Sequence, residues 1–147
     1  MEAFGKEIQI KRFGCNCLDE PGQPVEPSVN LFVKVTKSCN AHCLFCSNIE
    51  AAMPSVPFNV PKLLEIIRGL KAAGISVNRV NITGGEPSVV SALVEEILQK
   101  MEYSDFSDLH LHLNTNGLLP RSQMLMRHSR WNSISMSLHH YDLSKLS

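Results

Sequence analysis

From residue 30 onward, short segments of strand-like alternation follow one another with helical segments between them. The expected strands cover residues 30–36, 77–83, 109–114 and 133–139. A first helix is expected to begin near Asn59–Pro61 and to end at Gly74, because proline in a first turn and glycine after a last turn mark helix boundaries. A second helix is expected after Pro87, and a shorter third one from Pro120 to His128. This alternation predicts right-handed βαβ units and a parallel sheet.

The apolar residues of these expected helices recur at helical spacing. The first helix presents one apolar face, made of Leu63, Ile66, Ile67 and Leu70. The second helix carries a similar face, made of Val90, Leu93, Val94, Ile97 and Leu98. In the third helix, Met124 and Met126 are expected to pack against the core.

The expected strands alternate polar with apolar residues, whereas strands covered on both faces by helices are continuously apolar. In the third strand, leucines at 109, 111 and 113 alternate with His110, His112 and Asn114. The second and fourth strands follow the same pattern, with apolar residues Val80, Ile82, Ile134, Met136 and Leu138. We expect the apolar rows to face the helices and the polar rows to face the interior of a whole or partial barrel that holds a ligand. The alternative is a sheet face that is simply solvated.

Length and charge narrow the class of protein. The chain has 147 residues, of which 44% are hydrophobic, enough for one core. Lys plus Arg equals Asp plus Glu at 14 each, so no nucleic-acid or membrane partner is expected. The N-terminus lacks the apolar run of a signal peptide, and no segment is apolar enough to span a bilayer, which predicts a cytoplasmic protein. Residues 1–29 are expected to form an N-terminal segment with a weak strand at 6–12 and a proline-rich connector at 21–28, and residues 30–147 the core domain.

Three cysteines follow the first expected strand within eight residues, at Cys39, Cys43 and Cys46. Ligands bind at the C-terminal ends of parallel strands. Thiolates are soft ligands that suit zinc, copper(I) and iron–sulfur clusters. Structural zinc usually takes four ligands in spaced pairs, whereas a 4Fe–4S cluster held by three thiolates has one iron open to another ligand. A zinc site completed by His42, or by Cys15 and Cys17, is the alternative.

The cysteine loop, with the aromatic Phe45 directly before its third cysteine, resembles the C-x3-C-x-aromatic-C signature of the radical S-adenosylmethionine (SAM) superfamily. The segment Thr83–Pro87 resembles the GGE motif of that superfamily. Two glycines, Gly84 and Gly85, allow a close backbone approach, and the N–H groups of a helix entry suit a carboxylate. The resemblance implies that this turn binds the amino-acid end of SAM, with Glu86 as the partner of the ammonium group.

Two later strand ends extend the resemblance. Residues 114–117, Asn-Thr-Asn-Gly, are similar to the TNG segment of superfamily members such as the molybdenum-cofactor synthesis enzyme, which makes Thr115 a candidate SAM-binding residue. Ser137 falls where that branch has polar residues near the ribose and the methionine carboxylate. The alternatives are an Asn-Gly turn and a polar residue of the barrel interior. Cys15 and Cys17 are interpreted as ordinary thiols, and His139 and His140 as an interior and a surface histidine.

The resemblance covers roughly residues 30–142 and implies a partial parallel (β/α) barrel, with four βα units where the superfamily core has six. It implies a 4Fe–4S cluster on the three cysteines and SAM on the fourth iron. Reductive cleavage would then give methionine and a 5′-deoxyadenosyl radical, with an electron donor such as a flavodoxin or ferredoxin. A second chain completing the barrel is a further expectation.

The rival interpretations are a non-catalytic cluster- or SAM-binding fragment that acts through a partner, and a structural zinc module. The polar interior suits nucleotides, peptides or small metabolites, and no catalytic side chain is assigned.

Overall fold

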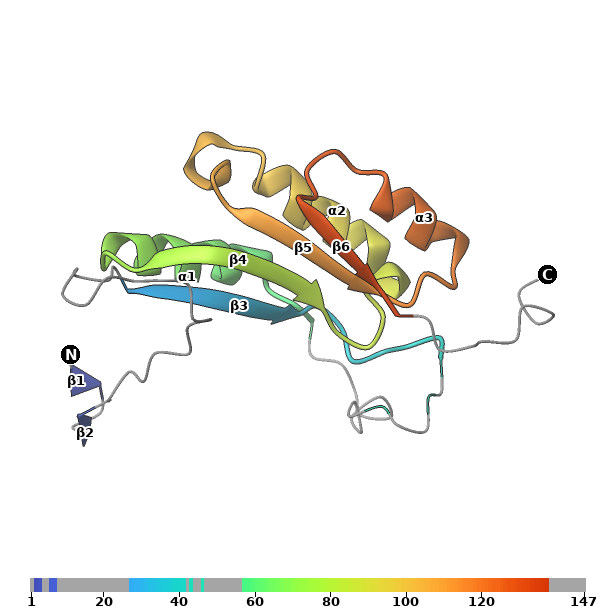
Figure 1. Cartoon of the computed structure of the whole chain (residues 1–147), viewed down its shortest axis with the longest axis horizontal. Helices are drawn as coiled ribbons and strands as arrows, with labels where there is room; N and C mark the ends of the chain where they lie inside the picture. Colours follow the sequence, from blue (N-terminus) through green and yellow to red (C-terminus); the bar gives the residue numbers. More distant parts are fainter. Residues whose placement is uncertain are drawn as a thin grey trace, which may run out of the picture.

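The computed structural model describes residues 27–41, 43, 46 and 57–137, together with the backbone of residues 2–3 and 6–7. Four strands form one sheet in the order β3-β4-β5-β6, and every neighbouring pair is parallel (Figure 1). The strands of this sheet are β3 (Ser28–Lys34), β4 (Ser76–Thr83), β5 (His110–Thr115) and β6 (Ser133–Met136). Two short strands, β1 (Glu2–Ala3) and β2 (Lys6–Glu7), form a separate antiparallel pair.

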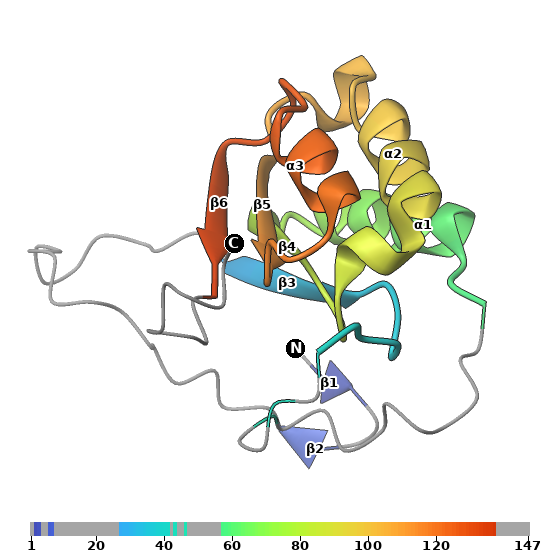
Figure 2. The ribbon, with the colours of Figure 1, turned by 90° about the vertical axis from the view of Figure 1, so that its right-hand side faces the viewer.

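Each pair of consecutive strands in the sheet is joined by helical structure. The helices are α1 (Val60–Ala72), α2 (Ser91–Lys100) and α3 (Pro120–Met126), with 3₁₀ turns η2 (Pro87–Val90) and η3 (Ser104–Phe106). Figure 2 shows the three α-helices on the same side of the sheet, so no helix of the described residues covers the other face. Four parallel strands in sequential order, alternating with three helices in the described residues, confirm the expected partial (β/α) barrel. No helix among the described residues is long and apolar enough to cross a membrane.

The boundaries of α1 follow from its capping residues. The side chain of Asn59 accepts a hydrogen bond from the backbone N–H of Lys62 at 2.9 Å, and Pro61 occupies the first turn. Gly74, at a φ of +73°, adopts the left-handed conformation just after the helix. The expected apolar face is only partly correct, because Leu63 and Ile67 are buried but Ile66 is 47% exposed. Ile66 therefore lies outside the stripe that α1 packs against the sheet.

The expected register of the strands is confirmed in the centre of the sheet. Leu111 and Leu113 are buried in the hydrophobic core, together with Val80 and Ile82 of β4. His110, His112 and Asn114 alternate with these leucines and therefore lie on the face without helices. Two side chains of that face, His112 at 8% exposure and Asn81 at 5%, are nevertheless buried. The polar face is thus not simply a solvated surface at its centre.

The C-terminal part of the described sheet differs more from expectation. The register pairs Ile134 with Leu113 and Met136 with Thr115, which places both on the helical side, yet they are 38% and 50% exposed. The reason is that β6 is the edge strand of the described sheet, where β5 is its one neighbouring strand. In α3, Met126 packs against the core, but the expected packing of Met124 is wrong, since it is 70% exposed. Cys15, Cys17, His42, Phe45 and residues 138–140 lie outside the described residues.

Candidate functional site at the C-terminal strand ends

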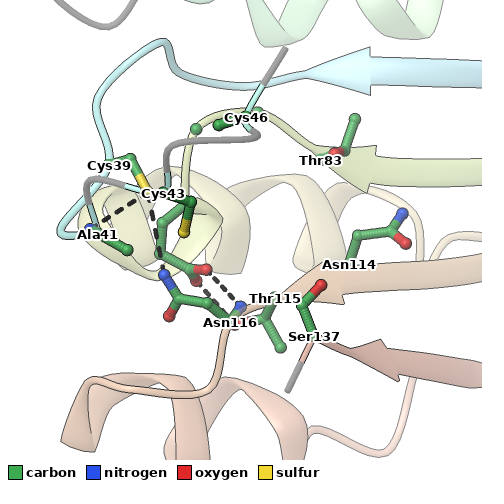
Figure 3. A pocket seen from close by; sticks show the side chains of 12 residues that line it. Cys39, Ala41, Cys43, Cys46, Thr83, Asn114, Thr115, Asn116 and Ser137 are labelled. Atoms are coloured by element: carbon green, nitrogen blue, oxygen red, sulfur yellow. Dashed lines mark hydrogen bonds between the residues drawn. The ribbon is translucent and has the colours of Figure 1, made fainter. Parts of the chain in front are cut away.

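A cavity of about 310 Å³ lies where the C-terminal ends of the parallel strands meet the cysteine loop (Figure 3). Loops from four strands contribute to its wall. The lining residues are Cys39, Ala41, Cys43, Cys46, Thr83, Gly84, Gly85, Glu86, Asn114, Thr115, Asn116 and Ser137. All residues named from the sequence as cluster or SAM ligands therefore line one cavity, except Phe45, which is outside the described residues. Thr83 and Asn114 extend the polar sheet face into this cavity, whereas His110 and His112 do not line it.

The three cysteines lie on one side of the cavity, opposite the strand ends. Cys39 and Cys43 are half-buried and Cys46 is exposed, and none of the three is in a disulfide. A backbone hydrogen bond of 3.1 Å from Cys46 N–H to the Cys43 carbonyl forms a tight turn between the second and third cysteines. The N–H of Ala41 donates to the Cys39 Sγ at 3.4 Å. The sulfur of Cys39 thus already accepts a hydrogen bond from the backbone.

The donor chemistry of this loop fits an iron–sulfur cluster, since three thiols open into one cavity. No group of three His, Cys, Asp or Glu side chains in residues 27–41, 43, 46 and 57–137 is arranged to hold a metal ion. The residues proposed to complete a zinc site, His42, Cys15 and Cys17, lie outside those ranges.

The Gly-Gly turn after β4 is fastened to the backbone that leads into the cysteine loop. Val35 N–H donates to the Thr83 carbonyl at 2.9 Å, and Gly85 N–H donates to the Thr36 carbonyl at 2.8 Å. The N–H of Glu86 continues the series to the Ser38 carbonyl, also at 2.8 Å. These three bonds prolong the pairing of β3 and β4 beyond the strands themselves.

Both glycines are required by this close approach. A Cβ built on Gly85 would lie 2.2 Å from the Ser38 carbonyl oxygen, and one built on Gly84 would lie 2.5 Å from that of Thr36. Sequence reasoning attributed the glycines to a ligand that comes near the backbone. In the structure, the neighbour that excludes a side chain is the backbone of the chain itself. The N–H groups of residues 85 and 86 are likewise engaged by the chain's own carbonyls.

Glu86 is a buried hub at the base of the cavity, with 1% of its surface exposed. Its Oε1 accepts from Ser88 N–H at 3.0 Å, from the Ser88 hydroxyl at 2.6 Å and from the Thr115 hydroxyl at 2.7 Å. Its Oε2 accepts from the backbone N–H of Asn116 at 2.7 Å. Glu86 thus joins the end of β4 to the end of β5. All four donors are neutral, and Oε2 accepts only one hydrogen bond among the described residues.

Asn116 is the site residue that sequence reasoning missed. Its amide Nδ2 donates to the Asn40 Oδ1 at 3.0 Å and lies 3.9 Å from the Cys39 Sγ, a long contact even for sulfur (Figure 3). Its Oδ1 accepts from Leu118 N–H at 3.0 Å. The side chain therefore links the segment after β5 to the first cysteine. The signals in the sequence were its position at a strand end, directly after Thr115, and its place in the segment that resembles TNG.

Thr115 and Ser137 differ in how available they are to a ligand. Thr115 is 4% exposed, and its hydroxyl donates to Glu86 while accepting from Gly117 N–H at 3.1 Å. Ser137 follows β6, is exposed, and is held by its backbone N–H, which donates to the Thr115 carbonyl at 2.9 Å. The hydroxyl of Ser137 is therefore accessible in the cavity, whereas that of Thr115 is occupied in fixing Glu86.

Comparison with known proteins agrees with this geometry. Residues 33–144 match the sequence profile of the Radical SAM superfamily. The chain belongs to the radical SAM superfamily, whose members use a 4Fe–4S cluster and SAM.

Among curated relatives, the chain is 35% identical over 101 residues to a protein named probable GTP 3′,8-cyclase from Archaeoglobus fulgidus, covering 69% of this chain and 31% of that protein. It is 32% identical over 100 residues to a protein named 7-carboxy-7-deazaguanine synthase from Methanothermobacter thermautotrophicus, covering 67% of this chain and 37% of that protein. The GTP 3′,8-cyclase from Clostridium botulinum is 28% identical over 103 residues, covering 69% and 31%. The chain thus spans about a third of the length of these relatives.

Proposed function

We propose that this chain is a radical SAM enzyme that holds its 4Fe–4S cluster on Cys39, Cys43 and Cys46 and binds SAM in the cavity beside them. The observation that carries the proposal is the meeting of three thiols and one buried carboxylate, Glu86, in a single cavity at the C-terminal strand ends. When bound and reduced by one electron, the cluster supplies the cleavage of SAM to methionine and a 5′-deoxyadenosyl radical.

Glu86 is the group best suited to the ammonium of SAM. A buried carboxylate is costly unless it is hydrogen-bonded and paired with a positive charge. The four donors that it has among the described residues are all neutral, so these residues provide hydrogen bonds without a cation. An ammonium group on Oε2 would supply that charge, and Thr115 and Asn116 would hold the carboxylate in position to receive it.

The remaining polar groups suit the rest of SAM. The hydroxyl of Ser137 and the amide of Asn114 lie in the cavity wall on the side of the strands, opposite the cysteines (Figure 3). Such groups donate and accept hydrogen bonds, as a ribose or a carboxylate requires. We assign Ser137 to this end of the ligand, and Gly84 and Gly85 to shaping the turn that carries Glu86.

A one-electron donor such as a flavodoxin or ferredoxin is the partner that this chemistry needs. A second partner is suggested by β6, whose Ile134 and Met136 are half exposed on an edge strand. Further strands, from a longer polypeptide or from a second chain, would cover this edge and close the barrel around the radical. The names of the relatives support a substrate that is a nucleotide, with GTP as the first candidate.

Anaerobic reconstitution with iron and sulfide tests the proposal. We expect a brown protein with iron and sulfide in near-equal amounts and, after chemical reduction, release of 5′-deoxyadenosine from SAM. Replacement of Cys39, Cys43 or Cys46 by Ala should each abolish the colour, while the matched Cys15→Ala should retain it. Stoichiometric zinc without sulfide would overturn the cluster in favour of a zinc module. A stable cluster that binds SAM but never cleaves it would favour the non-catalytic fragment.

A further inference from the structure

The sheet face opposite α1, α2 and α3 carries an unusual set of side chains. Cross-strand partners in a parallel sheet lie on the same face, so the register defines this set. It consists of Asn30, Phe32, Lys34, Arg79, Asn81, Thr83, His110, His112, Asn114, Ser133 and Ser135. Phe32 is its one apolar member, and none of the residues in this described set is acidic. The face is therefore polar with an excess of positive charge.

Two histidines of this face converge on one hydroxyl. Ser133 Oγ lies 2.8 Å from His110 Nε2 and 2.7 Å from His112 Nδ1. A hydroxyl has one proton and two acceptor lone pairs, so at least one of the two imidazoles donates its N–H to the oxygen. In the neutral pair, at least one of the two remaining ring nitrogens therefore carries no proton. Neither of these nitrogens makes a further hydrogen bond within the part of the chain that the structure describes.

Arg79 adds a positive charge next to the two histidines. It is the direct cross-strand partner of His110, one strand spacing away, and it is exposed. Among the described residues it forms no salt bridge. Burial, followed by the positive charges of Arg79 and of His112, lowers the pKa of His110 below its usual range. A metal cation would be repelled by the guanidinium, whereas an anion would be attracted by it.

We propose that Arg79, His110, His112 and Ser133 form a binding site for a phosphate group of the substrate, on the same sheet face that leads to the cysteine cavity. That the bound phosphate belongs to the substrate rests on the proposed function. That these residues bind a phosphate group does not. A guanidinium presents two parallel N–H groups to phosphate oxygens. The imidazoles add N–H donors on the neighbouring strand. One ligand would thus contact β4 and β5 at once.

Binding of a dianion would stabilise the protonated form of His110, so anion affinity should rise as the pH falls. The groups that face His110 are Arg79 on β4, His112 on its own strand and Ser133 on β6, and none of them is acidic. When His110 is protonated, its outer ring nitrogen becomes a donor. Because the pKa of His110 is lowered, the wild-type chain should bind a phosphate analogue more tightly near pH 5 than near pH 8.

Sulfate is a suitable probe because its charge does not change over this range. Titration of the chain without iron, followed by the histidine ring resonances in NMR spectra, should give saturable shifts for His110 and His112. We expect Arg79→Gln to weaken sulfate binding about tenfold. Arg121→Gln, which removes an exposed charge from α3 on the helical side, should leave binding unchanged. His110→Asn should remove most of the pH dependence, and His128→Asn should retain it.

The source of the phosphate is tested by comparing GTP with guanosine. GTP should shift the same two resonances and compete with sulfate, while guanosine should do neither. The absence of saturable shifts, equal weakening by Arg79→Gln and Arg121→Gln, or stoichiometric zinc at the two rings in place of sulfate would overturn the proposal. Because the measurement needs no cluster, its result is independent of whether the chain cleaves SAM.

Discussion

Glu86 and Asn116 link the three loops of the candidate site at the scale of single residues. Glu86 binds donors from its own turn and from the end of β5, and Asn116 continues from that end to the first cysteine. Neither side chain is part of the apolar core, but Glu86 also caps the 3₁₀ turn η2 by accepting from the Ser88 N–H. Its substitution should therefore affect the stability of the fold as well as the candidate site.

Replacing Glu86 by Gln should destabilise the chain by about 1–3 kcal/mol, since the new amide would point its own donors at hydroxyl or N–H groups. The change should also weaken SAM binding, because the ammonium loses its charge partner. Urea denaturation of the cluster-free chain measures the first effect and SAM titration of the reconstituted chain the second. Glu96→Gln, at an exposed position of α2, is the matched control and should change neither.

Asn116→Leu should make the reduction potential of the reconstituted cluster more negative. An N–H group near a cluster sulfur stabilises the reduced, more negative state, and the leucine removes it. Redox titration followed by EPR spectroscopy measures the shift, with iron content as the check that a cluster is present. Asn78→Leu, at the opposite end of the sheet, should leave the potential unchanged. A potential equal to wild type in Asn116→Leu would mean that the 3.9 Å contact has no electronic effect.

At the scale of elements, Arg130 fastens the loops at the end of the sheet away from the cysteines. Its guanidinium donates to the carbonyls of Met101 at 3.2 Å, Phe106 at 2.8 Å and Leu109 at 3.0 Å. These carbonyls belong to the segment between α2 and β5, while Arg130 precedes β6. One side chain therefore joins the segment between α2 and β5 to the segment that precedes β6.

Arg130→Lys should destabilise the chain by about 1–2 kcal/mol, although the charge is retained. A lysine ammonium is a compact charge and cannot reproduce the planar set of donors that reaches three carbonyls. Thermal or urea unfolding measures the difference. Arg127→Lys, at a neighbouring exposed position, should be within about 0.5 kcal/mol of wild type. Equal stability of the two variants would contradict the role given to Arg130.

The same scale explains what the sequence could and could not predict. Asn59, Pro61 and Gly74 act locally, so the bounds of α1 were predictable from their residue types. The exposure of Ile66 was not, because it depends on how much of the helix the sheet covers. The strand alternation predicted which face Leu111 takes, but not the shared hydroxyl of His110 and His112, which depends on the register with β6.

At the scale of the whole molecule, parallel strands bring distant motifs together. The cysteine loop, the Gly-Gly turn and the segment after β5 each follow a strand, and the ends of parallel strands meet at one edge. This is why their common cavity could be predicted from the order of the motifs alone. Asn116 was missed because its hydrogen bond to the cysteine loop depends on how two loops are positioned relative to each other. The residue spacing within one motif does not determine that position.

The fastening of the turn after β4 to the backbone of residues 36–38 has an evolutionary consequence. The fold requires both glycines whether or not a cofactor is bound, because a side chain at either position would meet main-chain carbonyls. A descendant of this chain that no longer bound SAM would lose its cysteines freely but would keep Gly84 and Gly85 for as long as it folded. In such a lineage, the cysteines should therefore be substituted first, while the two glycines remain.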